Sequence, residues 1–410
     1  MNYGPSSRGG PPGLAEAAAA ELAALPADGR RALPAWRRRG RFARRASAPS
    51  ATPGGPGERR LLLDLSSNDY LGLSTHPRVV AAAVAATGRH GVGGGSSRLI
   101  AGGGPVHAAL EASFAAFKHA EAAVLLPTGY HANLALLGCL AGPGDLVLQD
   151  KRNHASLLDA GRLCGADGRR WPHGRLDRLA ALLRAGAGAR RRIVVTDSVF
   201  SMDGDCADLP ALCDLCEAHG AWLVVDEAHA TGVLGAGGAG LAEHQGVTER
   251  VAATVSTASK ALGSLGGLVS GPRPLIDLLA NRARPLIYTT AAPPGVAAAI
   301  AAAVAVVRDE PHRRHRLAAI SARLRRGLAA AGWPVAMDPT PILPLPCGTN
   351  AAALALSRRL RSAGFLAPAI RPPTVPPGTA RVRLSLRCDL LDAELDRLRA
   401  AIGAPPQAVS

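Results

Sequence analysis

The fold class is indicated most clearly by the stretch Trp222-Leu-Val-Val-Asp226-Glu-Ala-His229-Ala-Thr-Gly232. It begins as a short apolar run and then turns abruptly to an aspartate, a histidine and a glycine. A short apolar run bounded by polar and turn-forming residues is typical of a strand that is buried on both faces of a sheet. We therefore expect residues 222–225 to form such a strand, with Asp226 at its carboxyl end.

Similar apolar runs recur on both sides of this stretch and alternate with Ala- and Leu-rich segments at helical spacing. Apolar strands that alternate with helices are typical of a mainly parallel sheet covered by helices on both faces. The sequence thus predicts an α/β fold. The expected strands are Ala123–Leu126, Leu146–Leu148, Arg192–Thr196, Trp222–Val225 and Thr254–Thr257.

The length of 410 residues and the changes in composition along the chain predict three parts. Residues 1–60 are expected to form an N-terminal arm, partly disordered, with one or two helices between residues 14 and 45. Residues 61–290 are expected to form the large domain, and residues 291–410 a smaller α+β domain. In this last part we expect a long helix at Gly295–Arg308 and strands at Ile342–Leu345 and Arg381–Leu386.

The composition argues against several classes of protein. The net charge of +16 could suit nucleic acid, but aromatic residues make up only 3% of the chain, which leaves few rings for base stacking. The longest apolar run, residues 295–307, is shorter than the roughly 18–20 residues needed to cross a membrane. Seven scattered cysteines suit a reducing compartment. We expect a cytoplasmic protein that binds neither nucleic acid nor a membrane.

The pair Cys213-x-x-Cys216, with Cys206 and His219 nearby, could be read as a zinc cluster. The second Cys-x-x-Cys that would make this pattern strong is missing. Residues 211–219 are expected to form a helix before an apolar strand, a place where buried free cysteines are ordinary. We therefore expect no metal site.

Polar residues follow three of the expected strands, at the edge where an open α/β sheet binds ligands. Asp226 and His229 follow one strand, Ser201 lies in the loop after another, and Thr257-Ala-Ser-Lys260 ends the third. The chain has only three lysines, at positions 118, 151 and 260. Lys260 follows the expected strand 254–257 and is the candidate for chemistry that needs an amine, whereas Lys118 and Lys151 could equally be surface charges.

A lysine amine beside an aspartate and hydroxyl groups suits pyridoxal phosphate, the cofactor that depends most on a Schiff base. Asp226 would keep the ring nitrogen protonated, and His154, at the start of a helix, would stack on the ring. Each residue alone has an ordinary alternative, because a strand-end Asp often caps a helix and a lone His is often a core or surface residue. Their common placement at strand ends is the stronger signal.

Hydroxyl groups and helix-start N–H groups would bind the phosphate of this cofactor. Ser201 and Thr257 supply hydroxyls. Gly129 and Tyr130 open the helix that follows the expected strand 123–126, where backbone N–H groups are available.

Six motifs in order resemble the α-oxoamine synthases, fold-type I pyridoxal-phosphate enzymes that join an amino acid to an acyl thioester with loss of CO2. The resemblance covers about residues 60–390. The motifs are Ser67-Asn-Asp-Tyr-Leu-Gly-Leu-Ser74, Gly94-Gly-Ser-Ser-Arg-Leu-Ile-Ala-Gly102, His154-Ala-Ser, Asp197-Ser-Val-Phe-Ser-Met-Asp-Gly204, Asp226-Glu-Ala-His-Ala-Thr-Gly232 and Thr257-Ala-Ser-Lys260.

The resemblance implies catalytic roles for Lys260, His154 and Asp226, with Lys260 holding the cofactor and moving protons. It implies that His229 binds the ring hydroxyl. Cofactor binding is expected from Gly129, Tyr130, His154, Ser201, Asp226, His229, Thr257 and Lys260.

Two segments favour the biotin-pathway member of the family, which uses L-alanine and a pimeloyl thioester. They are Ala228-His-Ala-Thr-Gly232 and the segment 369–381. By the resemblance, Arg371 and Thr374 in the second segment bind substrate. Arg37 is the expected arm arginine, with the register open among residues 37–39. Both coenzyme A and acyl carrier protein remain open as the thiol carrier.

Members of this family are homodimers, so Tyr288-Thr-Thr290 is expected near the phosphate of the neighbouring subunit. The glycine-rich loop 91–104 is expected to approach the cofactor or the partner, with a mobile surface loop as the alternative. Three other functions stay open: a synthase that uses glycine or serine with another acyl chain, an aminotransferase of the same fold, and a non-catalytic basic binding protein.

Overall fold

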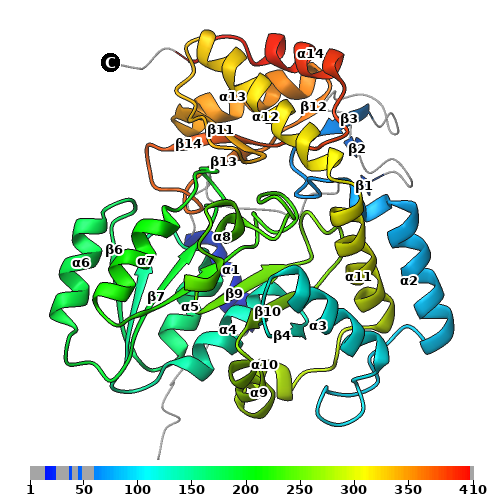
Figure 1. Cartoon of the computed structure of the whole chain (residues 1–410). Helices are drawn as coiled ribbons and strands as arrows, with labels where there is room; N and C mark the ends of the chain where they lie inside the picture. The colour runs from blue at the N-terminus through cyan, green and yellow to red at the C-terminus, as the bar shows by residue number, and fades with distance from the viewer. Residues whose placement is uncertain (1–13, 25–36, 39–44, 49–59, 407–410) are drawn as a thin grey trace, which may run out of the picture.

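The computed structural model describes residues 14–24, 37–38, 45–48 and 60–406. Its centre is a seven-stranded sheet in the order β4-β10-β9-β8-β7-β5-β6 (Figure 1). Strand β10 runs antiparallel to both of its neighbours, and the remaining pairings are parallel. The strands are β4 (Ala122–Leu126), β5 (Leu146–Asp150), β6 (Asp167–Trp171), β7 (Arg192–Asp197), β8 (Trp222–Asp226), β9 (Ala253–Thr257) and β10 (Gly267–Gly271).

Helices cover both faces of this sheet, as the alternating pattern predicted. One face packs on α4 (Gly129–Leu140), α5 (Ala155–Leu163), α9 (Arg273–Arg282) and α10 (Arg284–Ile287). The other face packs on α3 (Pro105–Phe117), α6 (Leu176–Ala185), α7 (Leu209–Ala218) and α11 (Pro294–Asp309). The predicted α/β class with a mainly parallel sheet is confirmed.

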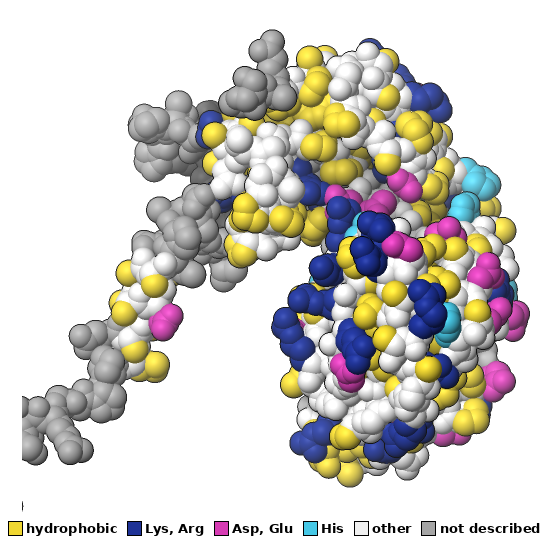
Figure 2. Space-filling view, turned by 90° about the vertical axis from the view of Figure 1, so that its left-hand side faces the viewer, with side chains coloured by type: hydrophobic (Ala, Val, Ile, Leu, Met, Phe, Trp, Pro, Cys, Tyr) yellow, Lys and Arg dark blue, Asp and Glu magenta, His cyan; other side chains and the backbone are white. Residues whose placement is uncertain are grey.

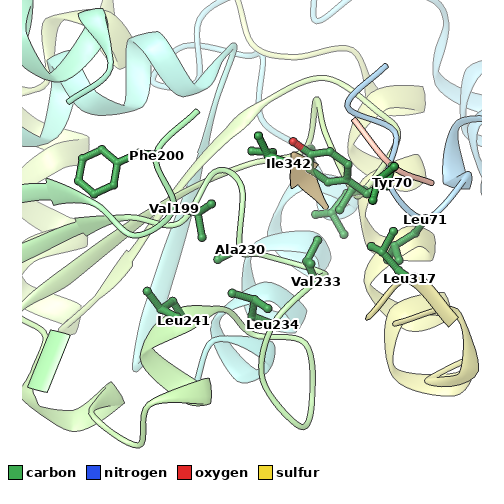
Figure 3. Packing of buried hydrophobic residues seen from close by; sticks show 14 of the residues in the cluster. Tyr70, Leu71, Val199, Phe200, Ala230, Val233, Leu234, Leu241, Leu317 and Ile342 are labelled. Carbon is green, nitrogen blue, oxygen red and sulfur yellow. The ribbon is translucent and has the colours of Figure 1, made fainter. Parts of the chain in front are cut away.

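The loops after β7 and β8 belong to the core that links the sheet to the C-terminal part. Val199 and Phe200 follow β7, and Ala230 follows β8. Together with Ile342, from the C-terminal part, and Tyr70 they form part of one buried apolar cluster (Figure 3). The segments that carry the candidate site residues therefore pack against a buried apolar core. The short helix α8 (Leu241–His244) contributes Leu241 to the same cluster.

The C-terminal part contains a three-stranded antiparallel sheet in the order β11-β14-β13. It lies above the large sheet in Figure 1 and carries three helices. Its elements are α12 (His312–Ala330), β11 (Ile342–Gly348), α13 (Asn350–Ser362), β13 (Ala369–Ile370), β14 (Ala380–Ser385) and α14 (Asp392–Ile402).

A second small sheet joins strands from the N-terminal part of the chain to a strand from the C-terminal part. Strand β12 (Phe365–Leu366) pairs in parallel with β3 (Arg60–Asp64), and β3 pairs with β2 (Arg45–Ala48), which in turn pairs with β1 (Arg37–Arg38). Helix α11 packs against α2 (Pro77–His90) and α3. The division at residues 60 and 290 stays a prediction.

The strands β6 and β10 were not predicted. β6 reads Asp-Gly-Arg-Arg-Trp and is an edge strand, so it has no apolar run to reveal it. β10 begins and ends with glycine. In the arm, the structure describes one helix, α1 (Leu14–Ala24), whereas Arg37–Arg38 within the same predicted helical region is a strand. Among the described helices, none combines the length and apolar character needed to span a membrane.

Candidate active site

Asp226 ends β8 at the centre of the carboxyl edge of the sheet, and its side chain is buried. The Asn133 amide on α4 donates to one carboxylate oxygen at 2.7 Å, and the Ala228 backbone N–H donates to the other at 2.9 Å. Each oxygen thus has a donor that fixes its direction. A second aspartate, Asp197, lies beside it as its register partner on β7.

A chain of hydrogen bonds connects Asp226 to His154. The Asn133 amide also donates to Ser156 Oγ at 2.8 Å, and that oxygen lies 2.8 Å from His154 Nδ1. Asn133 Oδ1 is buried and has no partner among the described residues. Asn133 therefore holds the starts of two helices, α4 and α5, at fixed positions relative to the aspartate.

His154 is the N-cap of α5 and its side chain is exposed toward a cleft. Its backbone N–H donates to Asp197 Oδ2 at 2.6 Å. Desolvation and the nearby charge of Lys260 lower the pKa of His154. Burial and the neighbouring Asp226 raise the pKa of Asp197 well above its usual range.

Lys260 lies three residues past the end of β9 and faces both aspartates. Burial lowers the pKa of its amine, although the charges of Asp226 and Asp197 oppose this shift. A lysine with a lowered pKa has a larger fraction of neutral amine, which can act as a nucleophile or accept a proton. The charge of Asp226 therefore acts on both Lys260 and His154, so these three predicted residues lie near one another.

His229 is buried beside this group. Its Nδ1 lies 2.7 Å from the Tyr70 hydroxyl. Burial, followed by the charges of Lys260 and Arg383, lowers the pKa of His229 well below its usual range, so the ring is neutral near pH 7. Burial raises the pKa of Tyr70 to about 12, although Arg383 opposes the shift. A neutral imidazole with one nitrogen bound to a phenol keeps its other nitrogen for a ligand.

The site includes an arginine that the sequence did not single out. Arg383, on β14, is buried and donates through Nε to the Ser201 carbonyl at 2.5 Å and through Nη1 to Ser385 Oγ at 2.7 Å. It also lies near Asn68 Oδ1, at 3.3 Å. Its charge affects both Lys260 and His229, so the C-terminal part contributes a cation directly to the site.

A second group lies at the start of α4. A Cβ atom on Gly129 would lie 3.3 Å from Thr257 Cβ, so glycine allows this helix start to approach Thr257 closely. Thr257 Oγ1 lies 2.8 Å from Ser259 Oγ and donates to the Gly266 carbonyl at 3.0 Å. The first N–H groups of a helix have no partner within it. Tyr130 follows Gly129, with its side chain exposed and its hydroxyl bonded to Asp159.

A cleft of about 600 Å³ opens beside His154. Ser201 and Thr374 line it from opposite sides, the first after β7 and the second from the C-terminal part. Arg371 is in the same loop as Thr374, whose N–H donates to the Arg371 carbonyl at 3.1 Å. The cleft also has Lys151 and Arg381 in its wall. Its lining mixes cations with apolar side chains.

The remaining predicted residues lie elsewhere. Arg37 lies in β1, opposite Ser47, and the structure describes its backbone only. Arg39 lies outside the described residues. Tyr288 is exposed, with the Arg284 guanidinium 4.8 Å from its ring centre. Thr290 forms an isolated bridge with Ser97, in the glycine-rich loop.

The cysteine pair of the possible zinc cluster is buried in α7. Burial raises the pKa of Cys216 to about 12 and also that of Cys213. All seven cysteines are free thiols. Over the part of the chain that the structure describes, no group of three or more His, Cys, Asp or Glu side chains could hold a metal ion.

Comparison with known proteins agrees with this geometry. Residues 61–402 match the family described as aminotransferase class I and II. The chain is 50% identical to the 8-amino-7-oxononanoate synthase of Anaeromyxobacter dehalogenans strain 2CP-1 over 88% of this chain and 89% of the relative. It is 48% identical to the enzyme of that name from Stutzerimonas stutzeri, over 86% and 90% of the two chains.

Two solved structures are similar to this chain over most of its length. The serine palmitoyltransferase of Sphingomonas wittichii superimposes with a TM-score of 0.81 at 32% identity, covering 84% of this chain and 86% of the other. The 8-amino-7-oxononanoate synthase of Francisella tularensis superimposes with a TM-score of 0.73 at 26% identity, covering 83% and 96%.

Proposed function

The chain belongs to the aminotransferase class I and II family and, within it, to the 8-amino-7-oxononanoate synthases, and we propose that it joins L-alanine to a pimeloyl thioester in biotin synthesis. The observation that carries the proposal is the group of Lys260, His154 and the buried Asp226 and His229 at one edge of the sheet. The products are 8-amino-7-oxononanoate, CO2 and the free thiol carrier.

The residues present fit pyridoxal 5'-phosphate. Gly129 lets the start of α4 lie close to Thr257, so the helix-start N–H groups and the Thr257 hydroxyl would hold the phosphate together, and a helix start favours an anion. Asp226 supplies a carboxylate with a fixed direction for a ring nitrogen, and neutral His229 keeps one nitrogen for a ring hydroxyl. When bound, the cofactor attaches the amine of the substrate and stabilises the electron pair left at its α-carbon.

The side chains would then handle the protons of the reaction. Lys260 Nζ removes the α-proton of alanine, which its lowered pKa favours. The α-carbon forms a bond to the thioester carbonyl, and the carbon–sulfur bond breaks to release the thiol. After the carboxylate leaves as CO2, Lys260 or His154 returns a proton to the α-carbon. His154 is well placed for this role because its ring borders the cleft.

Arg383 is our proposed partner for the carboxylate of the substrate. It lies beside Lys260, whereas Arg371 is in the loop of Thr374 and the side chain of Arg37 is not described. A guanidinium binds a carboxylate through two parallel hydrogen bonds, which fixes the orientation of the amino acid. We assign Ser201, Thr374 and Arg371 to the cleft that would receive the acyl chain.

We further propose a homodimer. Val92, Ile100 and Tyr288 expose most of their apolar surface on adjoining segments, which the Ser97–Thr290 bridge connects. Such a surface suits a contact with a second copy. Light scattering after size-exclusion chromatography should give twice the mass of the chain, and Ile100→Asp should shift the protein toward monomer. A monomeric wild-type protein with full activity would contradict this proposal.

The thiol carrier would be an acidic acyl carrier protein. Lys and Arg side chains gather over the face that carries α6 and β6 (Figure 2). Lys151 directly follows β5, its N–H donates to the Trp171 carbonyl at the end of β6 at 3.0 Å, and it also lies in the wall of the cleft. A basic face speeds the encounter with an acidic partner, and salt screens this effect. The free thiols support a cytoplasmic location.

The test uses purified protein loaded with pyridoxal phosphate. L-Alanine, glycine and L-serine are added separately, each with pimeloyl-coenzyme A, a pimeloyl carrier protein or a long-chain acyl-coenzyme A. Thiol release and product mass are then measured. We expect turnover with alanine and the pimeloyl donors. Turnover with serine and a long acyl chain would instead favour the second candidate, which the similarity to serine palmitoyltransferase suggests. No turnover with any pair would overturn the proposal.

A further inference from the structure

His173 lies in the turn after β6 and is held between two carboxylates. Its Nδ1 lies 3.1 Å from Asp150 Oδ2, and its Nε2 lies 2.6 Å from Asp205 Oδ2. Its ring also packs edge-on against Phe200, with ring centres 4.4 Å apart and planes at 81°. Two ion pairs and a ring contact thus fix this half-buried side chain on three sides.

The two aspartates belong to different segments of the candidate site. Asp150 ends β5, and its other oxygen accepts from the Arg152 N–H at 2.8 Å, in the turn that leads to His154. Asp205 belongs to the loop after β7 that contains Ser201. His173 therefore connects the turn before His154 to the loop of Ser201. His154 and Ser201 both line the same cleft.

The loop 199–206 is closed on itself. The Phe200 N–H donates to the Asp205 carbonyl at 3.0 Å, and the Gly204 N–H donates to the Phe200 carbonyl at 2.8 Å. Val199 and Cys206 form a bridge across its base. Because Phe200 and Asp205 are joined in this way, a group that holds both of them fixes the whole loop.

The C-terminal part also binds the loop 199–206, through three side chains. Arg383 donates to the Ser201 carbonyl, Arg381 pairs with Asp203, and Thr340 donates to the Gly204 carbonyl at 2.6 Å. Among the described contacts of this loop, two ion pairs connect it to the large sheet: His173 with Asp205 at 2.6 Å, and the more exposed Arg152 with Asp203 at 3.2 Å. Without His173, the loop would keep its attachment to the C-terminal part and the Arg152 pair, but it would lose its half-buried ionic attachment to the sheet edge.

We propose that His173 is a positioning residue that, as an imidazolium between Asp150 and Asp205, sets the wall of the acyl-thioester cleft. The proposal rests on the function proposed above for this cleft. His154 has its own attachments through Asp197 and Ser156, so the loop of Ser201 depends more on His173. We therefore expect His173 to govern binding of the thioester more than binding of alanine.

The ion pairs of His173 with Asp150 and Asp205, which we call the His173 tie, depend on pH because they need the charged imidazolium. Burial alone would lower its pKa, but the hydrogen bonds and charges of Asp150 and Asp205 outweigh this and raise the pKa to about 9. The other charged groups nearby are Arg152, on the turn after Asp150, and Asp203, which pairs with it at 3.2 Å. Since the folded pKa lies above that of a free histidine, the tie is complete below about pH 6.5 and is lost as the pH rises through about 9.

The test compares His173→Gln with wild type. The glutamine amide can bind one carboxylate but cannot carry the charge. We expect the KM for the pimeloyl thioester to rise about tenfold, while the KM for alanine changes less than about twofold. The alkaline rise in the thioester KM near pH 9 should disappear in the variant. His76→Gln is the matched control, because His76 also binds through both nitrogens, to the Arg78 N–H and to Glu310, away from the cleft.

A second readout needs neither cofactor nor turnover. Hydrogen exchange of the amides of Phe200 and Gly204 in the cofactor-free protein should be about tenfold faster in His173→Gln than in wild type, and the ratio should fall toward one between pH 8 and 10. Asp205→Asn should reproduce both effects and replaces His173→Gln if that variant does not fold. Unchanged exchange in either variant would overturn the proposal. Inactive wild-type protein would overturn the proposed function alone, because the exchange result would still stand or fall separately.

Discussion

Asp197 and Asp226 are register partners at the ends of the parallel strands β7 and β8, and both of their side chains are buried. Asp226 receives a hydrogen bond at each oxygen, whereas Asp197 receives one from the His154 N–H. Two carboxylates this close repel each other, and Lys260 is the cation that faces both. The amine that we propose as the nucleophile is therefore also the cation that offsets this repulsion.

Asp197→Asn should stabilise the cofactor-free protein at pH 8. Burial and Asp226 raise the folded pKa of Asp197 above its unfolded value, so ionising it costs stability as the pH rises from about 4 through the folded pKa. An asparagine oxygen can still accept from the His154 N–H. Urea unfolding should give a gain of at least about 1 kcal/mol at pH 8 and a smaller gain at pH 5. The exposed control Asp177→Asn should change stability by less than about 0.5 kcal/mol. A loss of stability at pH 8 would contradict the argument.

Lys260→Ala should abolish both the visible absorption band of the lysine-bound cofactor and turnover. The amine is the nucleophile and the proton carrier of the proposed mechanism, so we expect at least about a 10³-fold loss of kcat. Lys151→Ala should keep the band, because Lys151 is exposed in the wall of the cleft, whose lining includes neither Asp226 nor Asp197. A normal band in Lys260→Ala, measured by absorbance after adding pyridoxal phosphate, would exclude Lys260 as the attachment point.

Gly267→Ala should weaken cofactor binding. A Cβ at this position would lie 2.2 Å from the Thr128 carbonyl oxygen and 2.7 Å from the Gly129 nitrogen, so the start of α4 would have to move. We expect the Kd of pyridoxal phosphate to rise by about 10–100-fold, which corresponds to about 1.4–3 kcal/mol. Gly271→Ala on the same strand is the control, since its nearest contact would be the flexible Leu275 side chain at 3.3 Å. Fluorescence titration checks both, and equal affinities would refute the proposed phosphate site.

Arg383→Lys should raise the KM for L-alanine. A lysine keeps the charge but loses the planar fork that binds a carboxylate through two hydrogen bonds. We expect a loss in kcat/KM on the order of 10²-fold, seen in steady-state kinetics with alanine varied. Arg316→Lys, in a surface pair with Asp392, should leave kinetics unchanged. If Arg371→Lys has the larger effect on alanine, Arg371 and not Arg383 binds the carboxylate.

The sequence predicted the parts of the fold whose signals are local. The apolar runs before Asp226 and Lys260 revealed their strands because each run is buried on both faces. β6 was not predicted because an edge strand need not be apolar, and His173, two residues after its end, was missed with it. One or two arm helices were expected between residues 14 and 45; the structure describes one helix there, α1, and shows Arg37–Arg38 as a strand.

The unpredicted residues of the site are those whose partners are distant in the chain. Asn133 meets Asp226 across 93 residues, and Tyr70 meets His229 across 159. Arg383 and Arg381 are two residues apart on β14, so both point to the same face of the strand, and the sequence gave no sign of which arginine enters the site. Its contact with Asn68 spans 315 residues, beyond any local pattern. Tyr70 and Asn68 do lie in the quoted motif 67–74, which is the one signal that could have found them.

The pairing of β3 with β12 has a consequence for the order in which the molecule can assemble during translation. Leu63 pairs with Phe365, and the Ser385 N–H donates to the Leu65 carbonyl at 2.7 Å. The segment that carries Asn68 and Tyr70 therefore cannot reach its final place until residues 365–385 have left the ribosome. Contacts of such long sequence separation form late because the loop they close is long. A nascent chain can build the central sheet while one side of the candidate site is still missing, so β12 and β14 complete that site together with residues 63–70.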